Sequence, residues 1–127
     1  METDLKTVTE WKELLRSELK AARLSRNALA VSALRETLAA IENAEAPPPP
    51  ENAGAHDGPF AGSTPGLGAS EVERLKLTPE AVNVLVEREL EQRRSAAASY
   101  LSLARHNEAE ALMAQAELLS SLISRLS

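Results

Sequence analysis

The segment ERELEQRRSAAASY, residues 87–100, places two opposite charges on the apolar side of a predicted helix. At about 100° per residue, Arg93 falls in the middle of the stripe that contains Val82 and Val86, and Glu89 lies within about 40° of it. A glutamate four residues before an arginine is the favourable order for a helical ion pair. Burial of the pair incurs a desolvation cost that only further hydrogen bonds offset. We interpret Glu89 and Arg93 as a buried polar pair that specifies which helices meet or, alternatively, as part of a functional polar pocket.

A buried pair of this kind needs partners from neighbouring helices. The side chains at suitable positions are Arg35 and Glu42, near the edge of the apolar stripe of an earlier helical segment, and Gln115 on a later one. Partners for the pair could come from any of these three side chains.

A row of cations follows one side of the first predicted helix. Its members are spaced by about one turn and project within about 80° of one another, so they could follow a phosphate backbone. Long basic side chains can equally line the boundary of a core, with packed stems and hydrated charges. The candidate nucleic-acid-binding residues are Lys12, Arg16, Lys20 and Arg23, with Arg94 as a further contact.

The residue types that most often support metal binding or covalent catalysis are scarce. The sequence has no cysteine and two histidines, His56 and His106. His106 and Glu110 have helical i, i+4 spacing, but the additional inward carboxylates and Glu-x-x-His pairs of a di-metal bundle are missing. Neither a Gly-x-Ser-x-Gly elbow nor a Gly-Lys-Ser/Thr phosphate loop is present. We therefore expect no catalytic residue, no metal and no cofactor.

Four segments with helical periodicity must position these side chains. The first is expected from about residue 4 to 22, the second from its cap to about residue 44 or 46, the third from 79 to 103, and the fourth in the last 20 or so residues. Trp11 is expected as a packing anchor, and Leu34 and Leu119 as core residues. The predicted caps are Asp4 or Thr3, Ser25, Thr78 followed by Pro79, and Asn107.

A segment rich in proline and glycine separates the second helix from the third. The stretch from Pro47 to Gly68 contains all five glycines and six of the seven prolines. Such a composition predicts a mobile linker whose start is polyproline II. Because the other connections are short, we predict an all-α, four-helix assembly of two antiparallel helical hairpins joined by this long loop. The single domain 1–127 then comprises a hairpin in 1–46, a linker in 47–70 and a hairpin in 71–127.

The length and net charge of the chain limit the number of domains and the kinds of partner that we expect. A chain of 127 residues suits one domain. A net charge of −5 argues against an autonomous nucleic-acid binder, although a local patch could override the total. The start METDLKTVTEWKELL has early acids and no long apolar run, and no cysteine occurs. We therefore expect a cytoplasmic protein without a membrane segment.

Several segments resemble the GatB/YqeY family. LRETLAAIENAE, residues 34–45, matches the second-helix pattern Leu-Arg-x-x-Leu-x-Ala-Ile-x-Asn-x-Glu. Residues 77–100 are similar to the next helix, which has a Leu-Thr/Ser-x-x-x-Val start followed by Glu-x-x-x-Arg-Arg and an aromatic residue. Residues 107–122 resemble the Ala/Glu-rich helix after it, and residues 5–35 fit the family's first hairpin. The resemblance covers most of residues 14–122.

The resemblance implies an all-helical domain that corresponds to the first helical domain of the family. The second, small helical domain that usually follows is not in this sequence. In the B subunit of glutamyl/aspartyl-tRNA amidotransferase, the family domain forms a tail associated with tRNA recognition. The family label is carbon–nitrogen ligase with glutamine as amido-nitrogen donor, but the large catalytic part of that subunit is absent from this sequence.

Three functional hypotheses follow. The first is a non-catalytic, YqeY-like helical adaptor whose partner is tRNA or a tRNA-modifying or tRNA-charging enzyme. The second is a protein-interaction or self-association module, such as a homo-oligomer, with no nucleic-acid role. The third, implied by the family label alone, is a carbon–nitrogen ligase.

Overall fold

The computed structural model describes residues 5–47 and 74–125 of the chain. These residues form four α-helices and no β-strand, which confirms the predicted all-α class for this part of the chain. From residue 48 onward, the predicted linker lies outside the described residues. The helices are α1 (Val8–Leu24), α2 (Ala28–Glu45), α4 (Pro79–Ser102) and α5 (His106–Ser124).

The start of α1 differs from the prediction. The helix begins at Val8, and Thr7, rather than Thr3 or Asp4, is its N-cap. The Thr7 hydroxyl accepts a hydrogen bond from the backbone N–H of Glu10 at 3.1 Å, and the Glu10 carboxylate accepts one from the N–H of Thr7 at 2.9 Å. This reciprocal capping box satisfies two N–H groups at once, which is why the helix starts here and not earlier.

The predicted cap of α2 is also wrong. Ser25 is the C-cap of α1, and Asn27 is the N-cap of α2. The side-chain oxygen of Asn27 accepts a hydrogen bond from the N–H of Ala30 at 3.1 Å. Asparagine caps a helix at least as well as serine does, and its position after the turn leaves room for the chain to reverse.

The two remaining helices begin differently from each other. Thr78 caps α4, as predicted, by accepting a hydrogen bond from the N–H of Ala81 at 3.0 Å, and Pro79 occupies the first turn. The predicted cap Asn107 lies inside α5 instead. That helix begins at His106, and its N-cap, Arg105, makes no side-chain capping bond.

Both short turns have the same backbone geometry. The residue after the C-cap, Arg26 in the first turn and Ala104 in the second, has a positive φ of 59° and 61° respectively. The N–H of the next residue, Asn27 or Arg105, donates a hydrogen bond to the carbonyl five residues earlier, at 2.9 and 2.8 Å. This is the Schellman ending of a helix, here with a non-glycine residue at the left-handed position.

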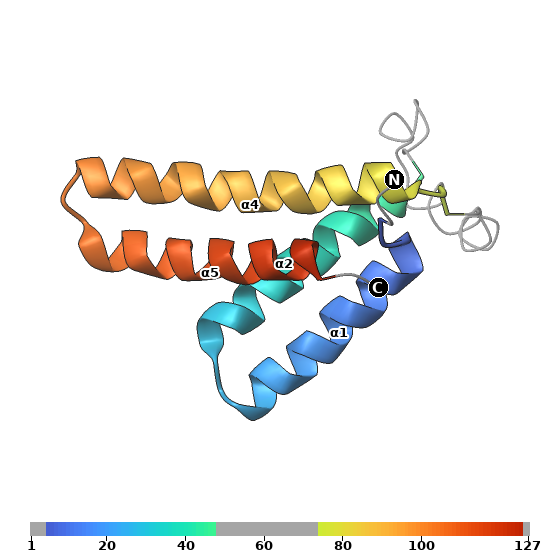
Figure 1. Ribbon diagram of the computed structural model, residues 1–127, viewed down its shortest axis with the longest axis horizontal. Helices are drawn as coiled ribbons and strands as arrows, with labels where there is room; N and C mark the ends of the chain where they lie inside the picture. The colour runs from blue at the N-terminus through green and yellow to red at the C-terminus, as the bar shows by residue number, and fades with distance from the viewer. Residues whose placement is uncertain (1–4, 48–73, 126–127) are drawn as a thin grey trace, which may run out of the picture.

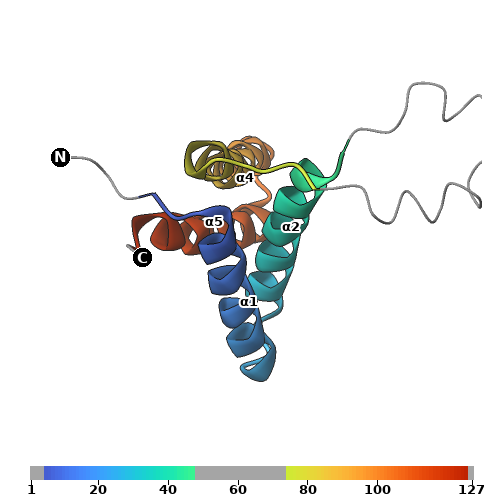
Figure 2. The ribbon, with the colours of Figure 1, turned by 90° about the vertical axis from the view of Figure 1, so that its right-hand side faces the viewer.

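The helices pack as consecutive pairs that share a core. α1 contacts α2, α4 contacts α5, and further contacts join α2 to α4 and α5, and α1 to α4. Figure 1 shows that the α1–α2 turn and the α4–α5 turn lie at different corners of the molecule. Figure 2 shows α1 and α2 projecting away from α4 and α5. Each pair therefore has one end that the other pair does not cover.

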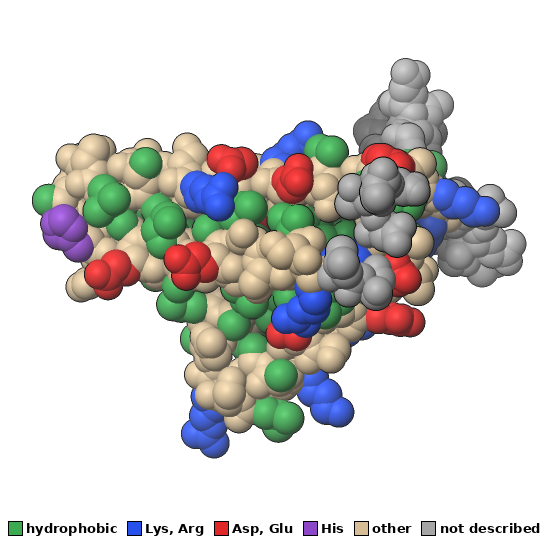
Figure 3. Space-filling view, viewed as in Figure 1, with side chains coloured by type: hydrophobic (Ala, Val, Ile, Leu, Met, Phe, Trp, Pro, Cys, Tyr) green, Lys and Arg blue, Asp and Glu red, His purple; other side chains and the backbone are tan. Residues whose placement is uncertain are grey.

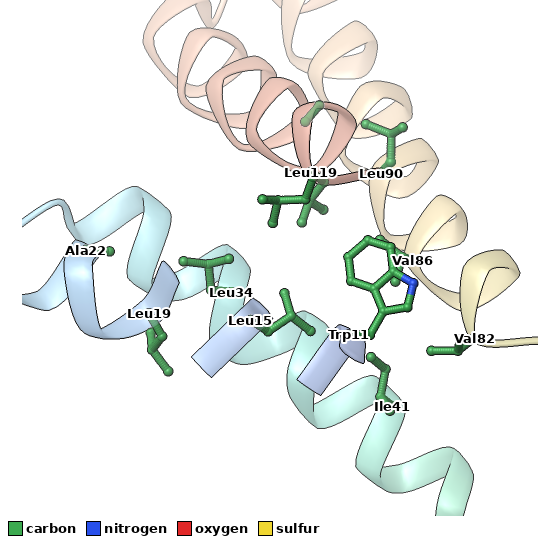
Figure 4. Packing of buried hydrophobic residues seen from close by; sticks show 12 residues of the cluster. Trp11, Leu15, Leu19, Ala22, Leu34, Ile41, Val82, Val86, Leu90 and Leu119 are labelled. Carbon is green, nitrogen blue, oxygen red and sulfur yellow. The ribbon is translucent and has the colours of Figure 1, made fainter. Parts of the chain in front are cut away.

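All four helices contribute to one hydrophobic cluster. Trp11 of α1 is 1% exposed, and its ring is directed toward Val86 of α4, with Leu119 of α5 nearby (Figure 4). Leu34 of α2 is equally buried. The expectations for Trp11, Leu34 and Leu119 are confirmed.

The two ends of the segment outside the described residues lie side by side. The N–H of Leu75, which precedes α4, donates a hydrogen bond to the carbonyl of Glu45, the last residue of α2, at 2.8 Å. The described residues before position 48 and after position 73 therefore meet at one place. No helix in the described ranges is long and apolar enough to cross a membrane.

Candidate functional site

Arg93 is buried in α4 and joins that helix to α2. Its Nη1 atom donates hydrogen bonds to the Glu89 carboxylate at 2.9 Å and to the Glu89 carbonyl at 3.0 Å. Its Nη2 atom pairs with the carboxylate of Glu36 on α2. The Nε atom is buried without a hydrogen-bond acceptor among the described residues. The polar pair predicted from sequence thus supplies two members of a three-residue cluster that joins two helices.

The third member of this cluster is not one of the predicted partners. Glu36 takes the place expected for Arg35 or Glu42, because it lies on α2 where that helix passes Arg93. Gln115 bridges different elements: its Nε2 atom donates to the carbonyl of Leu29 at 2.9 Å and joins α5 to the start of α2.

Lys12, the first of the predicted phosphate contacts, forms a partly buried ion pair. Its Nζ atom lies 2.6 Å from the Glu45 carboxylate, whose side chain is only 8% exposed, and Arg74 lies 3.8 Å from the same oxygen. A carboxylate at the C-terminal end of a helix is disfavoured by the helix dipole, so these cations offset its charge. Glu45 was missed by sequence reasoning, although it follows the buried Ile41 by one helical turn.

Two further predicted contacts, Arg16 and Arg94, form surface ion pairs. Arg16 lies 3.4 Å from Glu42 on α2, and Arg94 lies 3.0 Å from Glu91 one turn earlier on α4. Pairs this exposed contribute about 0–1 kcal/mol, so a phosphate could displace the carboxylate at little cost. Arg94 is on a different helix pair from Arg16, and the structure does not bring it into the row on α1.

The remaining predicted cations, Lys20 and Arg23, are exposed near the end of α1. Two further arginines accompany them, Arg26 in the turn and Arg35 on α2. Arg26 was not predicted as a site residue, and Arg35 was predicted only as a partner of the Glu89–Arg93 pair. None of these four side chains forms an ion pair with another described residue. Four unpaired cations therefore lie on the α1–α2 pair, whereas two others, Lys76 and Arg88, lie before and on α4.

Three of these arginines surround a surface depression. Its volume is about 690 Å³, and it lies between the end of α1 and the first turns of α2. The helical spacing of Ala28, Val31 and Arg35 places them on one face of α2, and that spacing is the signal that could have identified Arg35 from sequence. The depression is lined by Arg23, Arg26, Ala28, Val31, Ser32, Arg35 and Glu36.

A separate buried cation lies near the chain start. Lys6 donates a hydrogen bond from Nζ to the carbonyl of Leu122 at 2.9 Å, and the same atom lies 4.8 Å from the centre of the Trp11 ring. Burial lowers the pKa of Lys6, nearby Arg125 lowers it further, and Glu10 opposes the shift. A cation at the C-terminal end of α5 complements the helix dipole, so Lys6 fastens the chain start to α5.

The uncovered end of α4 and α5 exposes several apolar side chains. Leu101 is 52% exposed and Leu103 is 65% exposed, and Met113 on α5 is also exposed. Figure 3 shows hydrophobic side chains gathered over the part of α4 and α5 that extends beyond the other two helices. Among the described residues, this surface and the cationic end of α1–α2 are two features that could bind a partner.

The described residues contain no group of three or more histidine, cysteine or acidic side chains placed to hold a metal ion. His106 and Glu110, which have metal-compatible spacing, are both exposed. His56 lies outside the described residues.

A scan of protein-family models, a search of curated proteins and a search of solved structures each found no match to this chain. The assignment of function therefore depends on the side chains described above together with the resemblance in sequence.

Proposed function

We propose that this chain is a non-catalytic helical module of the GatB/YqeY type that associates with RNA in the cytoplasm, with tRNA or a tRNA-modifying or tRNA-charging enzyme as its partner. In this proposal, two antiparallel hairpins joined by the Pro/Gly-rich loop act as one unit. The observation that carries the proposal is the gathering of unpaired cations, Lys20, Arg23, Arg26 and Arg35, at one end of the molecule.

A local cluster matters because the whole chain is acidic. With a net charge of −5, the protein is repelled by RNA at long range, so binding needs a surface where cations are not already neutralised. Lys12 forms an ion pair with the largely buried Glu45, whereas Lys20 and Arg23 form no ion pair that RNA binding would have to break. The proposed phosphate contacts therefore lie close to the α1–α2 turn, and they do not extend along the whole predicted row of cations on α1.

The experiment is a titration of the full chain with tRNA at several salt concentrations. Replacing both unpaired cations of α1, as in Lys20→Gln with Arg23→Gln, should weaken binding and make the negative slope of log K against log salt less steep by about 1.4 to 1.8. The matched control replaces two other exposed, unpaired cations, Lys76→Gln with Arg88→Gln, and removes the same charge at a different place. The control should bind tRNA nearly as well as the wild type.

Two results would contradict the proposal. One is the absence of tRNA binding at low salt. The other is an equal loss of affinity in both double variants, because binding would then follow net charge and not the α1–α2 end.

A second candidate function, protein interaction or self-association, is supported by a separate observation. The exposed apolar side chains Leu101, Leu103 and Met113 form a surface suited to another protein or a second copy of this chain. Light scattering at several concentrations tests self-association, and Leu101→Glu with Met113→Glu should abolish it. A strict monomer at every concentration counts against this candidate.

The carbon–nitrogen ligase activity rests on the resemblance in sequence alone, and release of ammonia from glutamine is the assay that tests it.

A further inference from the structure

We propose that the depression at the α1–α2 end is a phosphate-binding site, in which Arg23, Arg26 and Arg35 together hold one phosphate group of an RNA or of a free nucleotide. The RNA case rests on the proposed function and names the chemical group that this surface recognises. The nucleotide case does not depend on it.

The three arginines approach the depression from three different elements. Arg23 belongs to the last turn of α1, Arg26 to the turn itself and Arg35 to the body of α2. Each guanidinium presents several N–H donors in a plane that matches two phosphate oxygens at once. Because none of the three is paired with a described carboxylate, their donors are available to a ligand.

The single carboxylate on the wall does not cancel this charge. Glu36 accepts a hydrogen bond from Ser32 at 3.1 Å and is paired with the buried Arg93, which also pairs with Glu89. The three lining arginines together with Arg93 carry four positive charges, against two negative charges on the glutamates. The surplus of two positive charges matches a phosphate monoester, which carries nearly two negative charges at neutral pH.

The other lining residues favour an organic phosphate over a bare ion. Ala28 and Val31 give the depression an apolar face beside the arginines. A volume of about 690 Å³ falls in the range of small-molecule sites and leaves room for a sugar and base next to the phosphate. Ala28 also opens α2, so the positive end of that helix dipole points toward the same place. A nucleoside monophosphate should therefore bind more tightly than inorganic phosphate, and a nucleoside without phosphate should bind weakly.

The test is an NMR titration of the ¹⁵N-labelled full chain with AMP, with inorganic phosphate and with adenosine. AMP and phosphate should shift the side-chain N–H signals of the three arginines. Arg26→Gln and Arg35→Gln should each weaken AMP binding about tenfold, the loss of one charged hydrogen-bonding group. The control Arg88→Gln, which removes an unpaired arginine from α4, should leave AMP affinity unchanged. Glu36→Gln should tighten AMP binding several-fold, because it removes the negative charge from the wall.

Three results would overturn the site: no shift of the three arginine signals at millimolar AMP, adenosine binding as tightly as AMP, or equal losses in Arg35→Gln and Arg88→Gln. Since Arg26 and Arg35 are exposed, their replacement should leave the helical circular dichroism of the chain intact.

The same variants separate this site from the proposed function. If tRNA binding depends on Lys20 and Arg23 but is unchanged by Arg26→Gln and Arg35→Gln, and AMP does not bind, then the site is wrong and the RNA-binding function stands. If AMP binds at the arginines while tRNA does not bind the chain, then the site stands with a free nucleotide as its ligand and the RNA-binding function is wrong.

Discussion

Arg93 occupies a position where the helical pattern calls for an apolar side chain, and it is held there between two carboxylates. Glu89 is largely buried, whereas the side chain of Glu36 is 60% exposed. Removing one member of a largely buried pair leaves the other charge without its partner, so the two side chains should be energetically coupled.

We predict that a double-mutant cycle of Arg93→Met and Glu89→Gln gives a coupling free energy of about 1–3 kcal/mol in urea unfolding. The neighbouring pair Arg94 and Glu91 is exposed on the same helix and serves as the control, with an expected coupling below about 0.5 kcal/mol. Equal coupling in the two cycles would mean that burial of Arg93 adds nothing to the pair.

Lys6 makes stability depend on pH in an alkaline range. Because burial lowers the pKa of Lys6 below its ordinary 10.5, the folded chain releases this proton at a lower pH than the unfolded chain does. Between the lowered pKa and 10.5 the unfolded state binds more protons, so the free energy of unfolding rises with pH through that window.

We therefore predict that the stability of the wild type relative to Lys6→Met increases as pH is raised from neutrality toward 10.5. Urea unfolding at a series of pH values measures the difference. A difference that stays constant or falls with pH would show that Lys6 is not destabilised as a cation.

Single side chains were predictable only where local spacing decides their contacts. The pairing of Glu89 with Arg93 follows from four residues of one helix. Glu36 and Glu45 could not be chosen in advance, since their partners depend on which face of α2 meets α4 and α1. Arg26 gave no periodic signal because it lies in a turn.

At the level of the helices, the left-handed backbone conformation in the turns lowers the stability of the protein by an amount that can be measured. Ala104 has a φ of 61°, a conformation that costs a non-glycine residue about 1–2 kcal/mol. We predict that Ala104→Gly raises the free energy of unfolding by about 0.5–1 kcal/mol, after the greater flexibility of glycine in the unfolded chain is included.

The control for this substitution is Ala98→Gly, on the exposed side of α4, which should lower the free energy of unfolding by a similar amount. Thermal or urea unfolding checks both. If Ala104→Gly is as destabilising as Ala98→Gly, the left-handed conformation at residue 104 is not the conformation in solution.

The start of a helix was predictable where the sequence offers a single capping residue. Thr78 followed by Pro79 has no nearby competitor, and α4 begins there. Near α1, three residues that can cap a helix occur within the first seven positions, and the glutamate three residues after Thr7 selects among them. This capping-box pattern is present in the sequence, but Leu5, which fits the apolar stripe, favoured an earlier start of the helix.

Across the whole molecule, the two helix pairs are joined by a shared core and by a return of the chain to one point. A hydrogen bond joins Leu75, before α4, to Glu45 at the end of α2. We predict that replacing residues 48–73 by a few Gly and Ser residues preserves a single cooperative unfolding transition and changes stability by no more than about 2 kcal/mol, given the weak length dependence of loop closure.

Circular dichroism with urea unfolding measures this outcome. Loss of helical signal, or two separate transitions, would show that the replaced segment contributes to the fold or that the helix pairs are stable apart from each other.

The all-α class was predictable because four segments show helical periodicity and none alternates with a period of two. The way in which the pairs meet was not, since the apolar stripes of four short helices can close in several arrangements. The contact of Arg93 with Glu36 and that of Gln115 with the Leu29 carbonyl, which the sequence could not assign, help to define the arrangement that is formed.

The central claim is that the cationic α1–α2 end binds nucleic-acid phosphate. The most direct measurement is the set of backbone amide shift changes in the ¹⁵N-labelled full chain as tRNA is added at low salt. The account predicts changes concentrated in residues 20–36. Changes concentrated in residues 100–113, at the apolar end of α4 and α5, or no changes at all, would contradict it.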